Sequence, residues 1–317
     1  MTAPRRAMTP RVRCVLAGRV QTLGSTTSGI DKKPVGGPCR VERLGLAGDE
    51  QADLRAHGGE FKAVHCYAWS HYEQWRREQP GQALFDQPGA FGENLSLDGI
   101  DEAGVCIGDR WRIGSALFTL TQGRQPCFKL NLRFAVADMA AQVQLNLRTG
   151  WYFGVHEPGW VQAGDACELV ARPHPGWTVA RLLALIRDRE TRPEVLDDTL
   201  ALPLPPSWRR LFERRLQSGQ IEEWQARLQG PQHLRQTPWP GSCARRDVVA
   251  PREQRASCMA TTPLPKGGLR ANENAQPGRV GRAKAVVVAK GGIEPPTRGF
   301  SVLAACVPAD SWQFSSC

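Results

Sequence analysis

The chain has 317 residues, 41% of them hydrophobic, which is enough for one large domain or two ordinary ones with a sizeable core. Its formal net charge of +10 is concentrated at one end: residues 231–317 carry 12 Lys and Arg against 5 Asp and Glu, which leaves 29 against 26 for residues 1–230. The nearly neutral front part has no basic stripe with interleaved aromatic residues. This pattern excludes nucleic acid as a primary partner.

The ten cysteines show no CxxC pair and no regular spacing, so neither a zinc site nor a disulfide framework is indicated. Reduced thiols in the cytoplasm fit this pattern best. The apolar run 14–17 near the N-terminus is too short for a signal peptide. No stretch approaches the roughly 20 apolar residues that a membrane-spanning helix needs, so we also expect no membrane association.

Residues 12–175 are expected to form a mainly β domain after a disordered segment, 1–11. Short apolar runs separated by Gly, Pro and Asp indicate antiparallel strands of a barrel or sandwich: 11–23, 38–46, 104–114, 116–122 and 165–172. Two helices interrupt them. The first is predicted over 70–79 with Ser70 as N-cap, and a second, shorter helix is predicted over 136–147.

Residues 176–228 change character and predict a small helical appendage on the β-rich body. Apolar residues recur at helical spacing in 177–190, with Thr178 available as N-cap, and helical segments follow at 193–202, 207–219 and 221–229. Residues 229–317 are rich in Pro, Gly and Arg and predict a disordered tail. Within it, AKGGIEPPTRGFSV resembles a translated transfer-RNA gene, so the tail is a candidate gene-boundary artefact.

The stretch QGRQPCFKLN, residues 122–131, contains the cysteine with the most unusual setting. Pro126 fixes the backbone before Cys127, and Arg124 and Lys129 bring two cations close, which favours the thiolate that nucleophiles and soft metals require. A single cysteine is nonetheless most often an inert packing residue. A core residue, a nucleophile and a metal ligand therefore all remain open for Cys127.

Two polar clusters precede this stretch. In residues 45–64, His57 is followed by Gly58 and Gly59, whose backbone freedom suits a turn with exposed N–H groups that receives an anion. In residues 89–100, Glu93 and Asn94 lie between glycines and lead into a strand. Each cluster taken alone is more typical of a plain turn than of a site.

The three clusters in this order resemble the MOSC family, named for the C-terminal domain of molybdenum cofactor sulfurases. Within it, the chain is similar to the bacterial subgroup that confers resistance to 6-N-hydroxylaminopurine and carries a three-helix domain after its barrel. The matching stretches are SGIDKKPVGGPCRV, GLAGDEQADLRAHGG, HYEQW, FGENLSLDG, IGDRWRIG, QGRQPCFKLN, GWYFGV and SWRRLFERRLQSGQIEEW. The resemblance implies a mainly β, MOSC-type β-barrel with a few helices, followed by a small three-helix domain.

The resemblance also implies molybdenum cofactor, a Mo-pyranopterin, as the bound group. By position, Cys127 would be the catalytic cysteine and the protein ligand to molybdenum. Lys62, Arg124 and Lys129 are the candidates for contacts to the charges of the cofactor, and Asn131 for a supporting hydrogen bond. A lysine at 62 offers a point charge where relatives often carry arginine with its bidentate fork.

The two glycine-flanked clusters would complete the cofactor site. His57, Gly58 and Gly59 are expected to line the pocket, with glycine N–H groups facing phosphate or pterin. Glu93 and Asn94 are expected to hydrogen-bond the pterin edges. The resemblance further implies binding of pyridoxal phosphate.

Relatives reduce N-hydroxylated bases and similar compounds to amines, a two-electron removal of one oxygen in which the cofactor carries the redox chemistry. The chain has no G-x-G-x-x-G and no iron–sulfur cysteine run, so a separate flavoprotein electron donor is implied. Phe128 or Trp151 is a candidate to stack on a purine substrate, unless both belong to the core. A homodimer is a further hypothesis.

Two other functions stay open at this stage. The barrel would serve as a carrier of cofactor or sulfur if Cys127 held a persulfide, or as a non-catalytic interaction module if this cysteine were structural. Metal analysis, turnover of an N-hydroxylated base and the Cys127→Ala variant distinguish the three.

Overall fold

The structure is a computed structural model that describes residues 9–53 and 58–231. Its main sheet has eight strands: β1 (Arg11–Ala17), β4 (Lys33–Pro34), β7 (Val64–Ala68), β8 (Leu95–Asp98), β9 (Arg110–Ile113), β10 (Ala116–Gly123), β11 (Trp151–Glu157) and β13 (Cys167–Ala171). Two smaller sheets accompany it: β5 (Cys39–Glu42), β6 (Gly45–Leu46) and β12 (Gly159–Val161) form one, and β2 (Gln21–Leu23) with β3 (Thr26–Ser28) the other.

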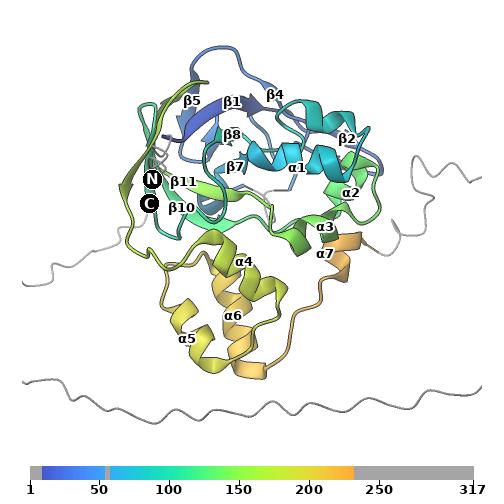
Figure 1. Cartoon of the computed structure of the whole chain (residues 1–317), viewed down its shortest axis with the longest axis vertical. Coiled ribbons are helices and arrows are strands. Elements are labelled where there is room, and N and C mark those ends of the chain that lie inside the picture. Colours follow the sequence, from blue (N-terminus) through green and yellow to red (C-terminus); the bar gives the residue numbers. More distant parts are fainter. Residues whose placement is uncertain (1–8, 54–57, 232–317) are drawn as a thin grey trace, which may run out of the picture. The chain divides into compact units, whose positions relative to one another are not determined.

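The strands of the main sheet follow the order β13-β9-β10-β11-β7-β8-β1-β4. Figure 1 labels β10, β11, β7, β8, β1 and β4 of this sheet. All neighbours are antiparallel except β7 and β8, which pair in parallel. The start of β1 also bonds the chain around β13, because Val12 N donates to Asp165 O at 2.9 Å and Cys167 N donates to Pro10 O at 2.8 Å. The sheet thereby curls round on itself, and the expectation of a mainly β, MOSC-type barrel is confirmed.

Side-chain alternation explains how the strands enclose a core. Along β9, Trp111 and Ile113 point inward and are buried, while Arg110 and Arg112 point outward. Burying such an aromatic or aliphatic side chain contributes about 1.5–3 kcal/mol. The same period along β10 and β11 fills the barrel interior with aliphatic and aromatic groups.

Three helices and one of two 3₁₀ turns, Ala83–Asp86, contribute to a second core, whereas the turn Glu60–Lys62 contacts β10 and β11. The helices are α1 (Ser70–Glu78), α2 (Lys129–Phe134) and α3 (Met139–Asn146). The expected N-cap Ser70 is instead the first residue of α1, after Trp69. The helix expected over 136–147 is found as α3, which begins three residues later. Helix α2 was not expected, and it ends at Ala135, which adopts a left-handed conformation with φ 52°.

The three-helix domain consists of α4 (Val179–Arg187), α5 (Pro193–Leu200) and α6 (Pro206–Ser218). Thr178 caps α4 as expected, because its hydroxyl accepts from Arg181 N at 3.1 Å. Helix α4 packs on β10, where a Cβ at Gly123 would lie only 2.9 Å from the side chain of Leu183. A glycine at this position therefore permits the helix to approach the strand that leads to Cys127.

The last helix, α7 (Gln225–Gln229), is shorter than the segment 221–229 that periodicity indicated. It lies beside α3, on the barrel side of the three-helix domain (Figure 1). Glu222 holds the chain before α7, since both of its carboxylate oxygens accept from the buried Arg215 at 2.9 and 2.8 Å. The end of the chain thus returns from the helical domain to the barrel.

Two expectations for the chain ends concern residues that are mostly not described. Residues 9–11 of the expected disordered segment 1–11 are described, and Arg11 begins β1. The expected disordered or artefactual tail, 229–317, lies outside the described residues from 232 onward. Among the helices in the described ranges, none is both long and apolar enough to cross a membrane.

Candidate functional site

A cavity in the barrel domain brings together residues from several strands and loops. Cys127 lies in its wall with an intermediate exposure. The cavity is lined by Ser28, Gly29, Ile30, Lys32, Asp49, Glu50, Gln51, Ala52, Gly58, Lys62, His65, Phe91, Gly92, Asn94, Arg124, Cys127, Lys129 and Tyr152.

The chain between β10 and α2 delivers three of these residues. Arg124 leaves β10 with its N–H bonded to Gly150 O at 2.9 Å, which keeps it beside β11. After Pro126, the carbonyl of Cys127 accepts from Leu130 N at 3.0 Å, so Cys127 stands at the entry to α2. Lys129 follows in the first turn of that helix. A fixed strand end and a helix start thus bring the thiol and two cations to one wall.

Positive charge is concentrated around the thiol. Burial lowers the pKa of the Lys62 ammonium, and the nearby Cys127 sulfur opposes that shift. The side chain of Arg124 is only 6% exposed, and its Nη1 has no hydrogen-bond partner within the described part of the chain. An unsatisfied buried guanidinium nitrogen costs free energy unless a ligand supplies the acceptor. The cavity is therefore suited to an anionic group.

Two cavity residues were missing from the expected site. His65 on β7 and Tyr152 on β11 stand opposite each other in the sheet, with ring centroids 5.0 Å apart. Burial, helped by the charge of Arg124, lowers the pKa of His65 to about 3, so its imidazole is neutral. Burial raises the pKa of the Tyr152 hydroxyl, which therefore keeps its proton at neutral pH, although Arg124 opposes this shift. A sequence motif does not reveal these two residues, because they come together only when β7 pairs with β11.

The opposite wall contains a buried ion pair between Lys32 and Asp49. Burial lowers the pKa of Lys32, and the Asp49 carboxylate opposes this shift. Asp49 also accepts from Gly18 N at 2.9 Å and from Asn94 Nδ2 at 2.9 Å. In turn, the Asn94 amide oxygen accepts from His65 N at 3.0 Å. Asn94 reaches the cavity as expected, but its amide also ties the strands together.

The structure brings most of the expected site residues into one cavity. Those that line it are Gly58, Lys62, Asn94, Arg124, Cys127 and Lys129. Gly59 is adjacent in the chain, with φ 80°, and precedes the turn that carries Lys62. His57 lies outside the described residues.

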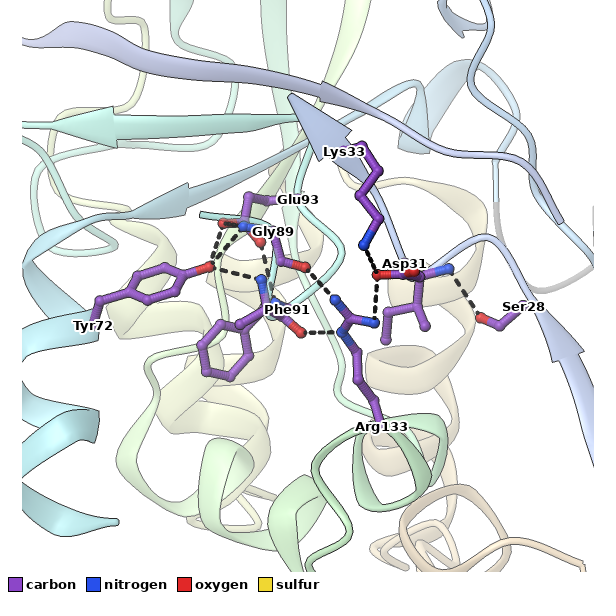
Figure 2. A network of polar contacts seen from close by, with 10 residues as sticks. Ser28, Asp31, Lys33, Tyr72, Gly89, Phe91, Glu93 and Arg133 are labelled. Carbon is purple, nitrogen blue, oxygen red and sulfur yellow. Dashed lines mark hydrogen bonds and ion pairs between the residues drawn. The ribbon is translucent and has the colours of Figure 1, made fainter. Parts of the chain in front are cut away.

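Glu93 is placed elsewhere than expected. It is completely buried, and its carboxylate accepts from Tyr72 Oη at 2.5 Å, Gly89 N at 2.8 Å and Phe91 N at 3.2 Å (Figure 2). Burial raises its pKa, while these hydrogen bonds oppose the shift. Its contacts hold the turn 89–93 rather than a pterin edge.

Arg133 secures the other side of this turn (Figure 2). Its guanidinium donates to Ala90 O at 2.8 Å and Gly89 O at 3.2 Å, and pairs with Asp31 at 3.0 Å. Glu93 and Arg133 thus fix the loop that presents Phe91 and Gly92 to the cavity.

Three further residues named for the site, Asn131, Trp151 and Phe128, lie outside the cavity lining. The amide of Asn131 donates to Leu228 O at 2.8 Å and accepts from Ala140 N at 2.7 Å, so this side chain joins three helices and does not line the cavity. Trp151 is fully buried in the barrel core and cannot stack on a substrate. Phe128 lies against Gly230 rather than at the cavity wall.

The residues present fit a group that brings its own metal ligands. In the described ranges, no cluster of three or more His, Cys, Asp or Glu side chains could hold a metal ion by itself. A single thiol is nevertheless a soft ligand for a metal that a cofactor already coordinates. The unsatisfied Arg124 nitrogen and the neighbouring lysines suit the anionic parts of such a cofactor.

Comparison with known proteins agrees with this architecture. The MOSC domain family matches residues 53–168, and the YiiM-like, 3-alpha helix domain family matches residues 177–219. Protein YiiM of Escherichia coli is 40% identical over 219 residues, which cover 68% of this chain and 97% of that protein. A protein named "Reductase" from Gibberella moniliformis is 35% identical over 208 residues, but these cover only 37% of its length.

Solved structures show the same fold. The crystal structure of YiiM from Escherichia coli has a TM-score of 0.58 at 34% identity and covers 69% of this chain and 99% of that one. YiiM from Geobacillus stearothermophilus has a TM-score of 0.56 at 29% identity, covering 65% and 99%. MOSC domains are associated with the molybdenum cofactor. The chain therefore belongs to the MOSC family, as a MOSC domain followed by the YiiM-like three-helix domain.

Proposed function

We propose that this protein is a molybdenum-cofactor-dependent reductase that converts N-hydroxylated purines and related N-hydroxylated compounds to amines. The observation that carries the proposal is the partly exposed Cys127 thiol in a cavity with Lys62, Arg124 and Lys129. This combination offers one soft metal ligand beside several partners for anions. The relative named "Reductase" supports the same class of reaction.

The side chains would divide the work of holding the cofactor. Cys127 would provide the sulfur ligand to molybdenum, and the three cations would hold the phosphate and the other anionic parts. When bound, the cofactor supplies the two-electron redox chemistry. The overall change is R–NH–OH + 2 e⁻ + 2 H⁺ → R–NH₂ + H₂O, in which the N–O bond breaks and the oxygen leaves as water.

Tyr152 is the candidate proton donor in this reaction. Tyr152 lines the cavity, and its hydroxyl keeps its proton at neutral pH because burial raises its pKa. A positioned acid can protonate the leaving hydroxyl oxygen as the N–O bond breaks. The electrons would come from a separate flavoprotein. Binding of pyridoxal phosphate stays a prediction from the family resemblance.

The test is molybdenum and pterin analysis of protein made in a cofactor-competent host, with turnover of 6-N-hydroxylaminopurine driven by a chemically reduced dye. We expect tightly bound molybdenum and turnover in the wild type, and a loss of roughly 100-fold or more of both in Cys127→Ala. Cys14→Ala is the matched control, since Cys14 is also partly exposed but outside the cavity. Loosely held cofactor without turnover would instead identify a carrier, and turnover in Cys127→Ala would contradict the assigned ligand.

A further inference from the structure

The chain beyond the three-helix domain returns to the turn that carries Cys127. Helix α7 lies outside residues 177–219, which match the three-helix family. Gly219 ends α6 in a left-handed conformation, with φ 64°, and the next residues run toward the barrel. Glu222 secures this connection, because it accepts from Arg215 and also from Trp224 Nε1 at 2.8 Å. These bonds attach the chain just before α7 to helix α6 of the three-helix domain.

Arg227 of α7 bonds both peptide groups that flank Cys127. Its guanidinium Nη1 donates to Pro126 O at 2.5 Å, and its main-chain carbonyl accepts from Phe128 N at 2.7 Å. The second guanidinium nitrogen, Nη2, donates to Gln144 Oε1 of α3 at 2.6 Å. The planar fork of arginine presents two nitrogens to these two acceptors in a fixed geometry, whereas a lysine ammonium is a compact point charge. One residue therefore fixes the backbone before and after the thiol.

The residues next to Arg227 extend this contact. Leu228 O accepts from the buried Asn131 Nδ2 at 2.8 Å. Gly230 passes so close to Phe128 that a Cβ there would lie 3.1 Å from the ring, and its φ of 84° also favours glycine. The segment 227–230 therefore packs against the turn that carries Cys127, and Cys127 itself lines the cavity.

We propose that Arg227 is a positioning residue for Cys127, and that α7 acts as a latch that holds the turn 126–128 with its thiol directed into the cavity. Burial lowers the pKa of the Arg227 guanidinium, and the nearby Cys127 sulfur opposes this shift, which agrees with a close approach of the two groups. The claim that the latch retains a metal rests on the proposed function, whereas the claim that it orders the turn does not.

Peptide-resolved hydrogen exchange tests the latch without any cofactor. In Arg227→Met, which keeps length but removes the donors, we expect amides of residues 124–131 to exchange about 10-fold faster, corresponding to the loss of about 1.4 kcal/mol of local stability. Arg227→Lys keeps the charge and a donating ammonium group but not the planar fork, so an intermediate rate is expected. Arg210→Met is the control, because Arg210 is exposed on α6. Wild-type exchange over 124–131 in Arg227→Met would overturn the latch.

Molybdenum retention tests the positioning role in protein from a cofactor-competent host. We expect Arg227→Met to retain about 10-fold less molybdenum after gel filtration, Arg227→Lys to recover part of it, and Arg210→Met to match the wild type. Faster exchange with unchanged retention would overturn the positioning role. A wild type that holds no molybdenum would refute the proposed function, while the exchange experiment still decides the latch. If Arg227→Met does not fold, Arg227→Lys serves both measurements.

Discussion

Two buried polar clusters of this protein differ in how completely their hydrogen bonds are satisfied. Around Glu93, both carboxylate oxygens accept hydrogen bonds, and Tyr72 supplies the shortest of them (Figure 2). Around Arg124, the buried nitrogen Nη1 has no partner in the described residues, and neither has the ring nitrogen Nε2 of His65. The first cluster is complete without a ligand, whereas the second is not.

This difference teaches how a structural cluster and a binding site can be told apart. A satisfied buried network stabilises one conformation, and removal of a member leaves its former partners unpaired. Unsatisfied buried groups lower stability and are retained where a ligand completes them. Substitutions in the Glu93 cluster should therefore affect mainly folding, and those in the Arg124 cluster mainly binding and activity.

The largest expected effect is on the stability of Glu93→Ala. This variant leaves the Tyr72 hydroxyl and two main-chain N–H groups without their acceptor, so we expect the free energy of unfolding to fall by about 3 kcal/mol. Urea denaturation measures this loss. Asp98→Ala is the control, since its ion pair with Arg13 is largely exposed. If Glu93→Ala were as stable as the wild type but retained cofactor poorly, the Glu93 cluster would belong to the binding site and not to the structural framework.

The next effect is on catalysis and concerns Tyr152→Phe. If the hydroxyl donates a proton to the leaving oxygen, its removal should lower kcat by roughly 100-fold while molybdenum content stays at the wild-type level. Steady-state kinetics with 6-N-hydroxylaminopurine and metal analysis of the same sample provide the two values. An unchanged kcat would exclude Tyr152 as the acid.

The pH dependence of stability sharpens the comparison further. The folded pKa of His65 is about 3, below its ordinary value of 6.5. Between pH 6.5 and pH 3, His65 is therefore protonated in the unfolded chain but neutral in the folded chain. The free energy of unfolding is unaffected by the titration of this residue above pH 6.5 and falls as the pH decreases toward 3. Between about pH 7.5 and pH 5 the loss should be about 2 kcal/mol. It should disappear in His65→Gln and persist in His156→Gln, whose histidine is exposed.

The smallest expected effect is that of Arg124→Met. Cofactor retention should weaken about 10-fold, because one cation of the cavity is lost. The free energy of unfolding should change by no more than about 0.5 kcal/mol, since the variant also removes an unsatisfied buried nitrogen. Denaturation and metal analysis of one preparation test both statements. A large loss of stability in Arg124→Met would mean that the Arg124 cluster, like the Glu93 cluster, is needed for folding.

The sequence predicts those parts of the site that are local in the chain. Arg124, Cys127 and Lys129 lie within six residues, so their proximity follows from one strand end and one helix start. His65 and Tyr152 meet only because β7 and β11 pair, which no local pattern indicates. Arg227 is 101 positions from Pro126, so no local pattern indicates that it bonds the turn of Cys127.

Glu93 shows a different limit of prediction. A glutamate between glycines is equally typical of a turn that holds itself together and of a turn that binds a ligand. The choice depends on the position of Tyr72 in another element, and this is a tertiary contact. Strand alternation and helix periodicity are local signals, and they predict a barrel or sandwich followed by helices. The choice of a MOSC-type barrel with a three-helix domain depends on the family resemblance.

The junction between β1 and the chain around β13 affects how this protein can be shortened. The segment that matches the MOSC family begins at residue 53, whereas β1 pairs with β8 and contacts residues 164–167. A fragment trimmed to the family match would leave the edge of β8 and the start of β13 without their backbone partners. Exposed strand edges promote aggregation. Any minimal soluble fragment should therefore begin before Arg11.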